Sequence, residues 1–202
     1  MKLRLGVLGS GKGSNFRAIM ESIKEGSLEA EVRIVISDVE DAGILKLASE
    51  WKVPSRYVPP GRFRTKLESE IEQLIVQILR DWDVELVVLA GFMRVLKEVL
   101  LDAFPGQIIN IHPSLLPKFR GLDAWTQALS AHEKITGCTV HYVDAGVDTG
   151  VILGQRTVAI LPDDTPERLH ARIQTAEHEL LPSVIAEIAR KRSHRSGKSE
   201  GG

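Results

Sequence analysis

The sequence predicts an α/β protein with a Rossmann-like, mostly parallel twisted sheet, helices on both faces of the sheet, and an antiparallel strand pair near the C-terminal part. Three observations support this class. Short apolar runs alternate with longer segments whose apolar residues recur every three or four positions, a rhythm typical of β-α-β units. A glycine-rich stretch follows the first apolar run, and two later strand-like runs have no helix between them.

The first half of the chain is expected to contain three strands and three helices. Residues 67–82 carry the clearest helical stripe, because their apolar side chains are spaced by three and four positions. Residues 84–92 (VELVVLAGF) contain a continuous apolar run, which is typical of a strand buried on both faces. In order, the expected elements cover residues 3–8 (strand), 16–24 (helix), 32–36 (strand), 42–51 (helix), 67–82 (helix) and 84–92 (strand).

The second half continues with a strand over 107–111 and a short helix over 123–132. Two strand-like runs, 137–143 and 151–158, then flank a short acidic loop that contains glycine. A loop this short joins antiparallel strands, since a parallel connection needs a long crossover. We therefore expect these two strands to extend the sheet as an antiparallel pair.

A final helix is expected from Pro166 to about Arg190, with Thr165 as its N-cap and Pro166 at the first helical position. The basic segment 191–202 (KRSHRSGKSEGG) has no apolar residue, so we expect a disordered tail. A single domain is then expected over residues 1–190.

Composition excludes several classes of protein. The 202 residues include 26 Lys and Arg and 27 Asp and Glu, a formal net charge of −1 that argues against a nucleic-acid or membrane binder. The longest apolar run, 86–93, is far shorter than the roughly 20 residues that cross a bilayer. Glycines also follow the N-terminus before any signal-like core. The single cysteine, Cys138, fits a reducing compartment, so we expect a cytoplasmic protein.

The glycine-rich stretch GSGKGSN, residues 9–15, lies where the first strand passes into the first helix. Backbone N–H groups and the positive end of the helix dipole converge at such a turn and can bind a phosphate. Ser14 stands where the dinucleotide fingerprint has its third glycine, and the Gly-Lys-Ser/Thr of a P-loop is absent. A tight turn without a ligand is the alternative interpretation. Ser14 and Asn15 add donors at the helix start.

Asn110 and His112 close the strand over 107–111. Because side chains alternate along a strand, these two point to the same side, at the edge where ligands bind in such sheets. Asp148 lies in the loop DAGVDTG, where it or Asp144 could be only a turn former. If Asp148 approaches His112, its charge favours the imidazolium form and raises the imidazole pKa. Such a trio suits acyl transfer through a tetrahedral intermediate.

Other chemistries fit the sequence less well. Asp148-Thr149-Gly150 is also the aspartic-protease triplet, but that chemistry needs a second triplet or a symmetric all-β dimer. No serine lies in a G-x-S-x-G elbow, and Cys138 fits a buried strand position. The histidines show neither HExxH nor Cys-rich spacing, so no metal site is expected.

Glu177 interrupts the apolar stripe of the final helix, four positions after Ile173. A carboxylate in such a seam costs stability unless it is paired or reaches a ligand. Gln174 lies one turn before it. Glu177 therefore either forms a structural salt bridge or accepts hydrogen bonds from a sugar near the glycine-rich stretch.

Five motifs in this order resemble the folate-dependent formyltransferases, and within them the phosphoribosylglycinamide formyltransferases. The resemblance covers about residues 3–190 and rests on GSGKGSN, LAGFMRVL, INIHPSLLPKFRGLDA, VDAGVDTG and ARIQTAEHELLP. It implies direct transfer of the formyl group of 10-formyltetrahydrofolate to the amine of 5-phosphoribosylglycinamide, the third step of de novo purine biosynthesis. It implies a monomer or homodimer that binds these two small molecules, with no metal, nucleic acid or membrane partner.

The resemblance also implies a role for each matching residue. Asn110 and His112 would stabilise the oxyanion, and Asp148 would keep His112 charged and help to remove a proton. Gly13, Ser14 and Asn15 would hold the phosphate, while Gln174 and Glu177 would contact the ribonucleotide. The folate pocket would be formed by Arg64, Met93, Arg94, Val95, Leu96, Asp144, Ala145, Gly146 and Val147. Lys12 and Trp125 depart from the family pattern.

Three rival functions are considered. A formyltetrahydrofolate deformylase resembles this domain and hydrolyses the same folate, but it usually carries an extra N-terminal domain. A methionyl-tRNA formyltransferase shares the Asn-x-His-Pro-Ser-Leu-Leu-Pro loop but needs a C-terminal domain for tRNA. A non-catalytic nucleotide-binding module would use the glycine-rich stretch, with Asp38 on the ribose of a dinucleotide.

Overall fold

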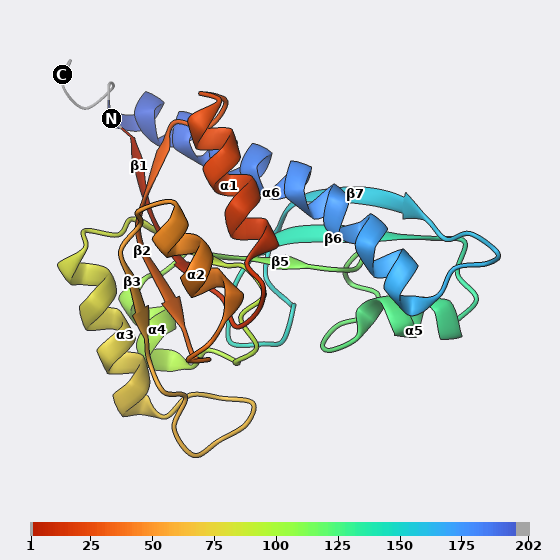
Figure 1. Cartoon of the computed structure of the whole chain (residues 1–202), viewed down its shortest axis with the longest axis horizontal. Coiled ribbons are helices and arrows are strands. Elements are labelled where there is room, and N and C mark those ends of the chain that lie inside the picture. The colour runs from red at the N-terminus through yellow and green to blue at the C-terminus, as the bar shows by residue number, and fades with distance from the viewer. Residues whose placement is uncertain (1, 197–202) are drawn as a thin grey trace.

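The computed structural model describes residues 2–196, which form one seven-stranded sheet in the order β3-β2-β1-β4-β5-β6-β7 (Figure 1). Strands β1 to β5 run parallel, while β6 pairs antiparallel with both β5 and β7. The predicted fold class is therefore confirmed. The strands are β1 (Leu3–Leu8), β2 (Ala30–Ser37), β3 (Ser55–Tyr57), β4 (Leu86–Leu89), β5 (Ile108–His112), β6 (Ile135–Tyr142) and β7 (Ile152–Ala159).

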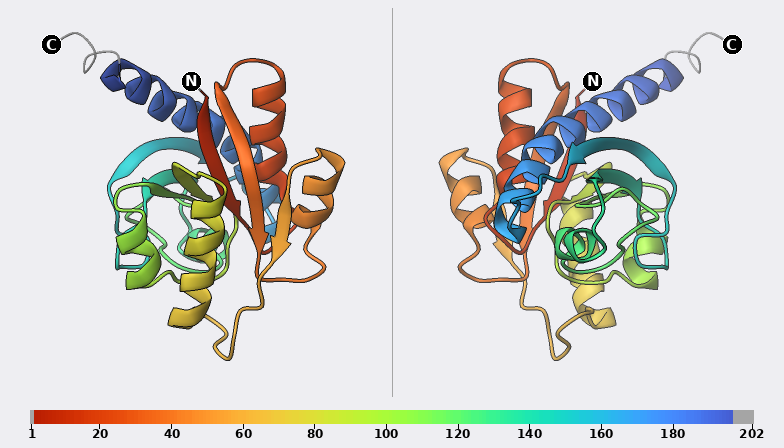
Figure 2. Two further views of the ribbon diagram at one scale, coloured as in Figure 1. Left: turned by 90° about the vertical axis from the view of Figure 1, so that its left-hand side faces the viewer. Right: turned by 90° about the vertical axis from the view of Figure 1, so that its right-hand side faces the viewer.

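Helices cover both faces of the sheet, and the two side views in Figure 2 show the layers. Side chains from α1, α2 and α6 share one hydrophobic core with the sheet, and side chains from α3 and α4 share the other. No helix among residues 2–196 is long and apolar enough to cross a membrane. The helices are α1 (Ser14–Lys24), α2 (Gly43–Glu50), α3 (Ser69–Asp81), α4 (Glu98–Ala103), α5 (Ala124–Ser130) and α6 (Pro166–Ser196).

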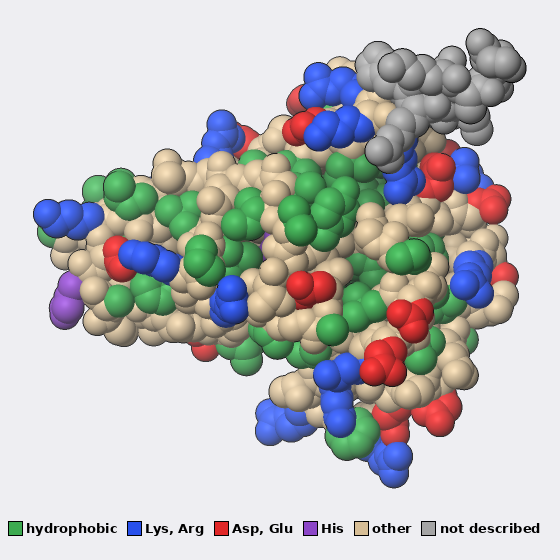
Figure 3. All heavy atoms as spheres, turned by 180° about the vertical axis from the view of Figure 1, so that it is seen from behind, with side chains coloured by type: hydrophobic (Ala, Val, Ile, Leu, Met, Phe, Trp, Pro, Cys, Tyr) green, Lys and Arg blue, Asp and Glu red, His purple; other side chains and the backbone are tan. Residues whose placement is uncertain are grey.

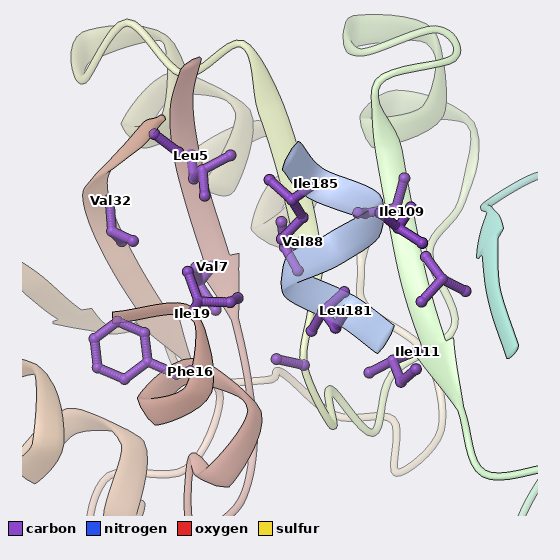
Figure 4. Close-up of a cluster of buried hydrophobic side chains, with 14 of the residues drawn as sticks. Leu5, Val7, Phe16, Ile19, Val32, Val88, Ile109, Ile111, Leu181 and Ile185 are labelled. Carbon is purple, nitrogen blue, oxygen red and sulfur yellow. The ribbon is translucent and has the colours of Figure 1, made fainter. Parts of the chain in front are cut away.

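The core under α1 and α6 fixes these two helices on the central strands (Figure 4). Phe16 of α1 is fully buried with Val7 of β1, and Leu181 of α6 is fully buried in the same cluster as Val88 of β4. Fully burying side chains of this size contributes about 1.5–3 kcal/mol each. This packing places the N-terminus of α1 beside Glu177 of α6.

Two short elements were not expected from the sequence, β3 and α4. Strand β3 has three exposed residues and pairs only with β2 at the sheet edge, so it carries no apolar pattern. Helix α4 has six residues, too few for a periodic stripe. Its N-terminus is capped by the buried carboxylate of Glu72, which accepts hydrogen bonds from the N–H groups of Lys97 and Leu100.

Helix α6 confirms the predicted start but not the predicted end. Thr165 Oγ1 accepts a hydrogen bond from Arg168 N, as an N-cap does. The expectation of disorder from residue 191 is wrong for residues 191–196, because the helix continues to Ser196. Lys191 pairs with Glu187 one turn earlier, and Arg192 donates to the Glu85 carbonyl oxygen, so polar contacts support this last part of the helix. The rest of the predicted tail, 197–202, lies outside the described residues.

Candidate active site

A cleft of about 680 Å³ lies beyond the carboxyl ends of β1, β4 and β5. The loops that follow these three strands, the loop between β6 and β7, and one face of α6 form its walls. This position is the expected one, because loops leave a parallel sheet at the carboxyl ends of its strands.

Most of the residues selected from the sequence lie in the wall of this cleft. They are Gly13, Ser14, Asn15, Met93, Arg94, Val95, Leu96, Asn110, His112, Asp144, Gly146, Val147, Asp148, Gln174 and Glu177. Arg64 and Ala145 do not line it; both are exposed. Arg64 belongs to the basic loop between β3 and α3, where Figure 3 shows Lys and Arg side chains gathered at the bottom of the view.

The phosphate end of the cleft is built from the first residues of α1. Gly13 is the N-cap residue, with a left-handed φ of 81°. A Cβ atom at Gly13 would also lie 2.8 Å from Cα of Ile44, so only glycine fits at this position. Ser14 and Asn15 follow as the first helical residues, whose N–H groups have no acceptor within the helix. This arrangement suits an anion.

Glu177 faces Asn15 across the same end of the cleft. Asn15 Nδ2 donates to Glu177 Oε2 over 2.9 Å, and Asn15 Oδ1 is buried without a hydrogen-bond partner among the described residues. Glu177 is only 6% exposed, and this burial raises the pKa of its carboxyl to about 7, against the opposing hydrogen bond from Asn15. No salt bridge within residues 2–196 includes Glu177, so the structural salt-bridge interpretation is wrong.

Asp148 forms the centre of the other end of the cleft. Its Oδ2 lies 3.3 Å from Nδ1 of His112 and accepts a hydrogen bond from Gly121 N over 2.9 Å. Asp148 has a φ of 53°, so its backbone is held in the left-handed region where strain is stored at functional sites. Burial raises the pKa of Asp148, but the contact with His141, the hydrogen bond from Gly121 and the nearby His112 bring that pKa below its usual value.

The pKa of His112 corrects one expectation. Asp148 raises this pKa, as expected, but burial of the ring lowers it more, so the net pKa lies below 6.5. Its Nε2 lies 2.8 Å from the carbonyl oxygen of Phe119. Since a carbonyl oxygen only accepts, the Nε2–H of His112 donates to it.

His141 is a part of this cluster that sequence reasoning missed. It is 2% exposed on β6, and its Nε2 lies 3.5 Å from Asp148 Oδ1 and 3.3 Å from Asn110 Nδ2. Its Nδ1 donates to the carbonyl oxygen of Tyr142 over 2.8 Å, and in the tautomer with the proton on Nδ1 alone, Nε2 can accept the Asn110 N–H. Only the antiparallel register, which pairs Asn110 with His141, could have revealed it.

The two departures noted in the sequence also face the cleft. The ring of Trp125 stacks on that of His170, with centroids 3.8 Å apart and planes 5° apart. Both rings and Lys12 line the wall near the glycine loop, residues 9–15. His170 precedes Gln174 by four positions and therefore lies on the same face of α6.

The family model for formyl transferases matches residues 3–185. The chain belongs to the formyl transferase family. It is 43% identical to the phosphoribosylglycinamide formyltransferase of Bacillus subtilis over 185 residues, which cover 92% of this chain and 94% of that protein. The chain is also 44% identical to the trifunctional purine biosynthetic protein adenosine-3 of Drosophila pseudoobscura pseudoobscura, where the match covers 92% of this chain but only 14% of that protein.

Solved structures of formyl transferases have the same fold. Glycinamide ribonucleotide transformylase 1 of Symbiobacterium toebii superposes with a TM-score of 0.90 at 42% identity, over 95% of this chain and 89% of that one. Phosphoribosylglycinamide formyltransferase of Bacillus halodurans superposes with a TM-score of 0.86 at 41% identity, over 92% of this chain and 94% of that one. The resemblance drawn from the five motifs is confirmed.

Proposed function

We propose that this formyl transferase transfers the formyl group of 10-formyltetrahydrofolate to the amine of 5-phosphoribosylglycinamide, a step of purine biosynthesis. One observation carries the proposal: a continuous cleft contains both the glycine loop at α1 and the cluster of Asn110, His112 and Asp148. Such a cleft can hold the phosphate of one substrate while the amine of that substrate meets a formyl group. The names of the relatives support the same reaction.

The ribonucleotide binds at the α1 end. Its phosphate accepts hydrogen bonds from the N–H groups at Gly13, Ser14 and Asn15, where the helix dipole also favours negative charge. The ribose hydroxyl groups donate to the Glu177 carboxyl group and to the free Oδ1 of Asn15. The second of these hydrogen bonds would satisfy the buried Oδ1 of Asn15, an acceptor that is expensive to leave unpaired.

The formyl group is transferred at the other end of the cleft. The amine nitrogen attacks the formyl carbon, and the bond from this carbon to N10 of the folate then breaks. Asn110 donates one Nδ2 hydrogen to His141, which leaves the second hydrogen for the oxyanion. His112 supplies the other donor when its Nε2–H exchanges the Phe119 carbonyl oxygen for the oxyanion.

The proton balance of the reaction is assigned to Asp148 and His112. The amine loses one proton, and N10 of the leaving tetrahydrofolate gains one. Asp148 stays ionised, because its pKa lies below the usual value, and its carboxylate beside Nδ1 of His112 offsets part of the effect of burial on the His112 pKa. The carboxylate can accept the amine proton through a water molecule and return it to N10.

The folate lies between residues 93–96 after β4 and residues 144–147 of the loop between β6 and β7. Residues of both segments line the cleft and can contact the pterin ring. Arg64 lies at the rim, outside the cleft wall, and would contact the acidic tail of the folate only from there.

The dinucleotide-binding alternative loses its ribose ligand in this structure. The side chain of Asp38 is 3% exposed, and its carboxylate is paired with Arg94 over 2.6 Å and accepts a hydrogen bond from Ser10. It is therefore not free to bind a ribose. The deformylase alternative shares the folate end of the cleft but has no use for the paired Asn15 and Glu177.

A two-substrate assay tests the proposal. Purified protein is expected to formylate 5-phosphoribosylglycinamide only when 10-formyltetrahydrofolate is supplied. Formate release at an equal rate without the ribonucleotide would instead identify a deformylase. Tight binding of NADH without any binding of folate would identify the nucleotide-binding module.

A further inference from the structure

Three side chains outside the reacting cluster connect the two ends of the cleft. We call Ser10, Asp38 and Arg94 the strut. Ser10 Oγ donates to Asp38 Oδ1 over 2.5 Å, and Arg94 Nε donates to Asp38 Oδ2 over 2.6 Å. Each oxygen of the Asp38 carboxylate is thus held by one partner. These two partners are 84 positions apart in the chain, and they meet because β1 and β4 are neighbours in the sheet.

The strut is buried at Asp38 and partly buried at Ser10 and Arg94, and it ends on backbone groups of both substrate-binding segments. Ser10 lies in the glycine loop, its Oγ accepts a hydrogen bond from Met93 N over 2.9 Å, and its own N–H donates to Gly91 O over 3.0 Å. Arg94 donates from Nη1 to the carbonyl oxygens of Phe63 and Arg64. The strut therefore fixes the phosphate loop, the start of the 93–96 segment and the loop with Arg64 relative to one another.

The strut does not take part in the chemical step itself, since Ser10 and Asp38 do not line the cleft. The Asp38 and Arg94 side chains are only 3% and 14% exposed. Burying such a pair contributes little net stability, because the loss of hydration offsets much of the attraction. Because this pair loses hydration and joins two binding segments, we interpret its role as holding these two segments in position.

We propose that Ser10, Asp38 and Arg94 are positioning residues that couple the two ends of the cleft. When the phosphate orders the glycine loop, Ser10 is held in place, and through it the Met93 N–H and the Asp38–Arg94 pair are held as well. The segment that binds the folate is then already ordered, so the folate binds more tightly. By linkage, bound folate tightens ribonucleotide binding by the same factor. The inference rests on the proposed function, because it assumes these two ligands.

The test measures binding without reaction. Tetrahydrofolate has no formyl group to transfer, so its Kd can be measured by calorimetry with and without saturating 5-phosphoribosylglycinamide. The ribonucleotide is expected to lower this Kd about fivefold or more, the smaller end of usual coupling. Ser10→Ala removes one hydroxyl group and no apolar packing, and it is expected to reduce the effect to less than about twofold. Ser10→Thr keeps the hydroxyl group and should restore it.

Two further variants complete the design. Ser27→Ala is the matched control, because the hydrogen bond of Ser27 Oγ to the Ser22 carbonyl oxygen is exposed and far along the chain from the glycine loop; it should leave the coupling unchanged. Asp38→Asn keeps the shape of the side chain without its charge and should weaken the coupling. Thermal unfolding of each variant verifies that it is folded.

The outcomes separate the two proposals. Full coupling in Ser10→Ala, or no coupling in the unmodified protein despite binding of both ligands, would overturn the inference and leave the proposed function intact. Equal weakening of both Kd values with an unchanged ratio would indicate a purely structural role and would also overturn it. Failure of the unmodified protein to bind tetrahydrofolate at all would overturn the proposed function, and the inference with it.

Discussion

Glu177→Gln should make the protein more stable at high pH than the parent chain. Glu177 is buried and its pKa is raised from 4.5 to about 7. In the unfolded chain the carboxyl ionises at its ordinary pKa, so the carboxyl keeps its proton up to a higher pH in the folded state than in the unfolded state. The folded protein therefore loses stability as the pH rises from 4.5 through 7, and above that the loss is complete.

The size of this loss follows from the pKa shift. At 1.36 kcal/mol per unit, the shift from 4.5 to about 7 corresponds to about 3 kcal/mol. Glutamine has the shape of the protonated acid and does not titrate, so the variant avoids this loss. The stability difference between variant and parent is expected to move by about 3 kcal/mol in favour of the variant between pH 4 and pH 8.

Urea unfolding without ligands, at both pH values and for both proteins, measures the difference. Burial and the charge of Glu177 raise the pKa of Cys138 to about 12, so this thiol does not titrate between pH 4 and pH 8. Groups that Glu177 does not perturb contribute equally in the two proteins and cancel in the comparison. An unchanged stability difference between variant and parent at the two pH values would refute the argument that burial of Glu177 controls this pH dependence.

In steady-state assays the same variant should raise the ribonucleotide KM more than the folate KM, and equal effects on the two KM values would refute the ribose assignment.

Three further predictions concern the cleft. Asp148→Asn should lower kcat by roughly 10²–10⁴-fold with the fold intact, and an unchanged kcat would remove Asp148 from the mechanism. His141→Phe should lower kcat about ten- to hundredfold with little change in either KM, because Asn110 loses the acceptor that orients it; His141→Gln, which keeps an acceptor, should lose less. Gly13→Ala should raise the ribonucleotide KM and lower the unfolding temperature, because φ is 81° there and Cα of Ile44 is 2.8 Å from the added atom; a normal ribonucleotide KM would argue against phosphate binding at this turn.

The sequence predicted those parts of the site that follow from local geometry. Alternation along β5 placed Asn110 and His112 on one side, and a break in the stripe of α6 identified Glu177. Both patterns depend only on the period of one element. The turn at Gly13 could be predicted in the same way, since glycines between a strand and a helix indicate a backbone that other residues cannot adopt.

The parts that were missed depend on contacts between distant segments. His141 joins the cluster only through the register of β5 and β6, which no pattern within β6 specifies. Asp38 looked like a free carboxylate after β2, and its pairing with Arg94 depends on the loops that meet at the sheet edge. Arg64 was expected in the folate pocket, but its loop leaves the side chain outside the cleft wall. Short elements such as β3 and α4 were missed because they carry too few residues to show a period.

The length of α6 has a practical consequence for building larger proteins and attaching probes. Glu177 lies in the cleft, and Ser196 follows at the far end of the same helix, about 28 Å away at 1.5 Å per residue. Strand β1 begins near that end of the helix, so both described ends of the chain point away from the substrates (Figure 1). A fusion partner, surface linker or fluorescent label at either end would leave the cleft entrance open. This placement of the two ends also fits the trifunctional relatives, in which the matching segment covers only a small share of the protein.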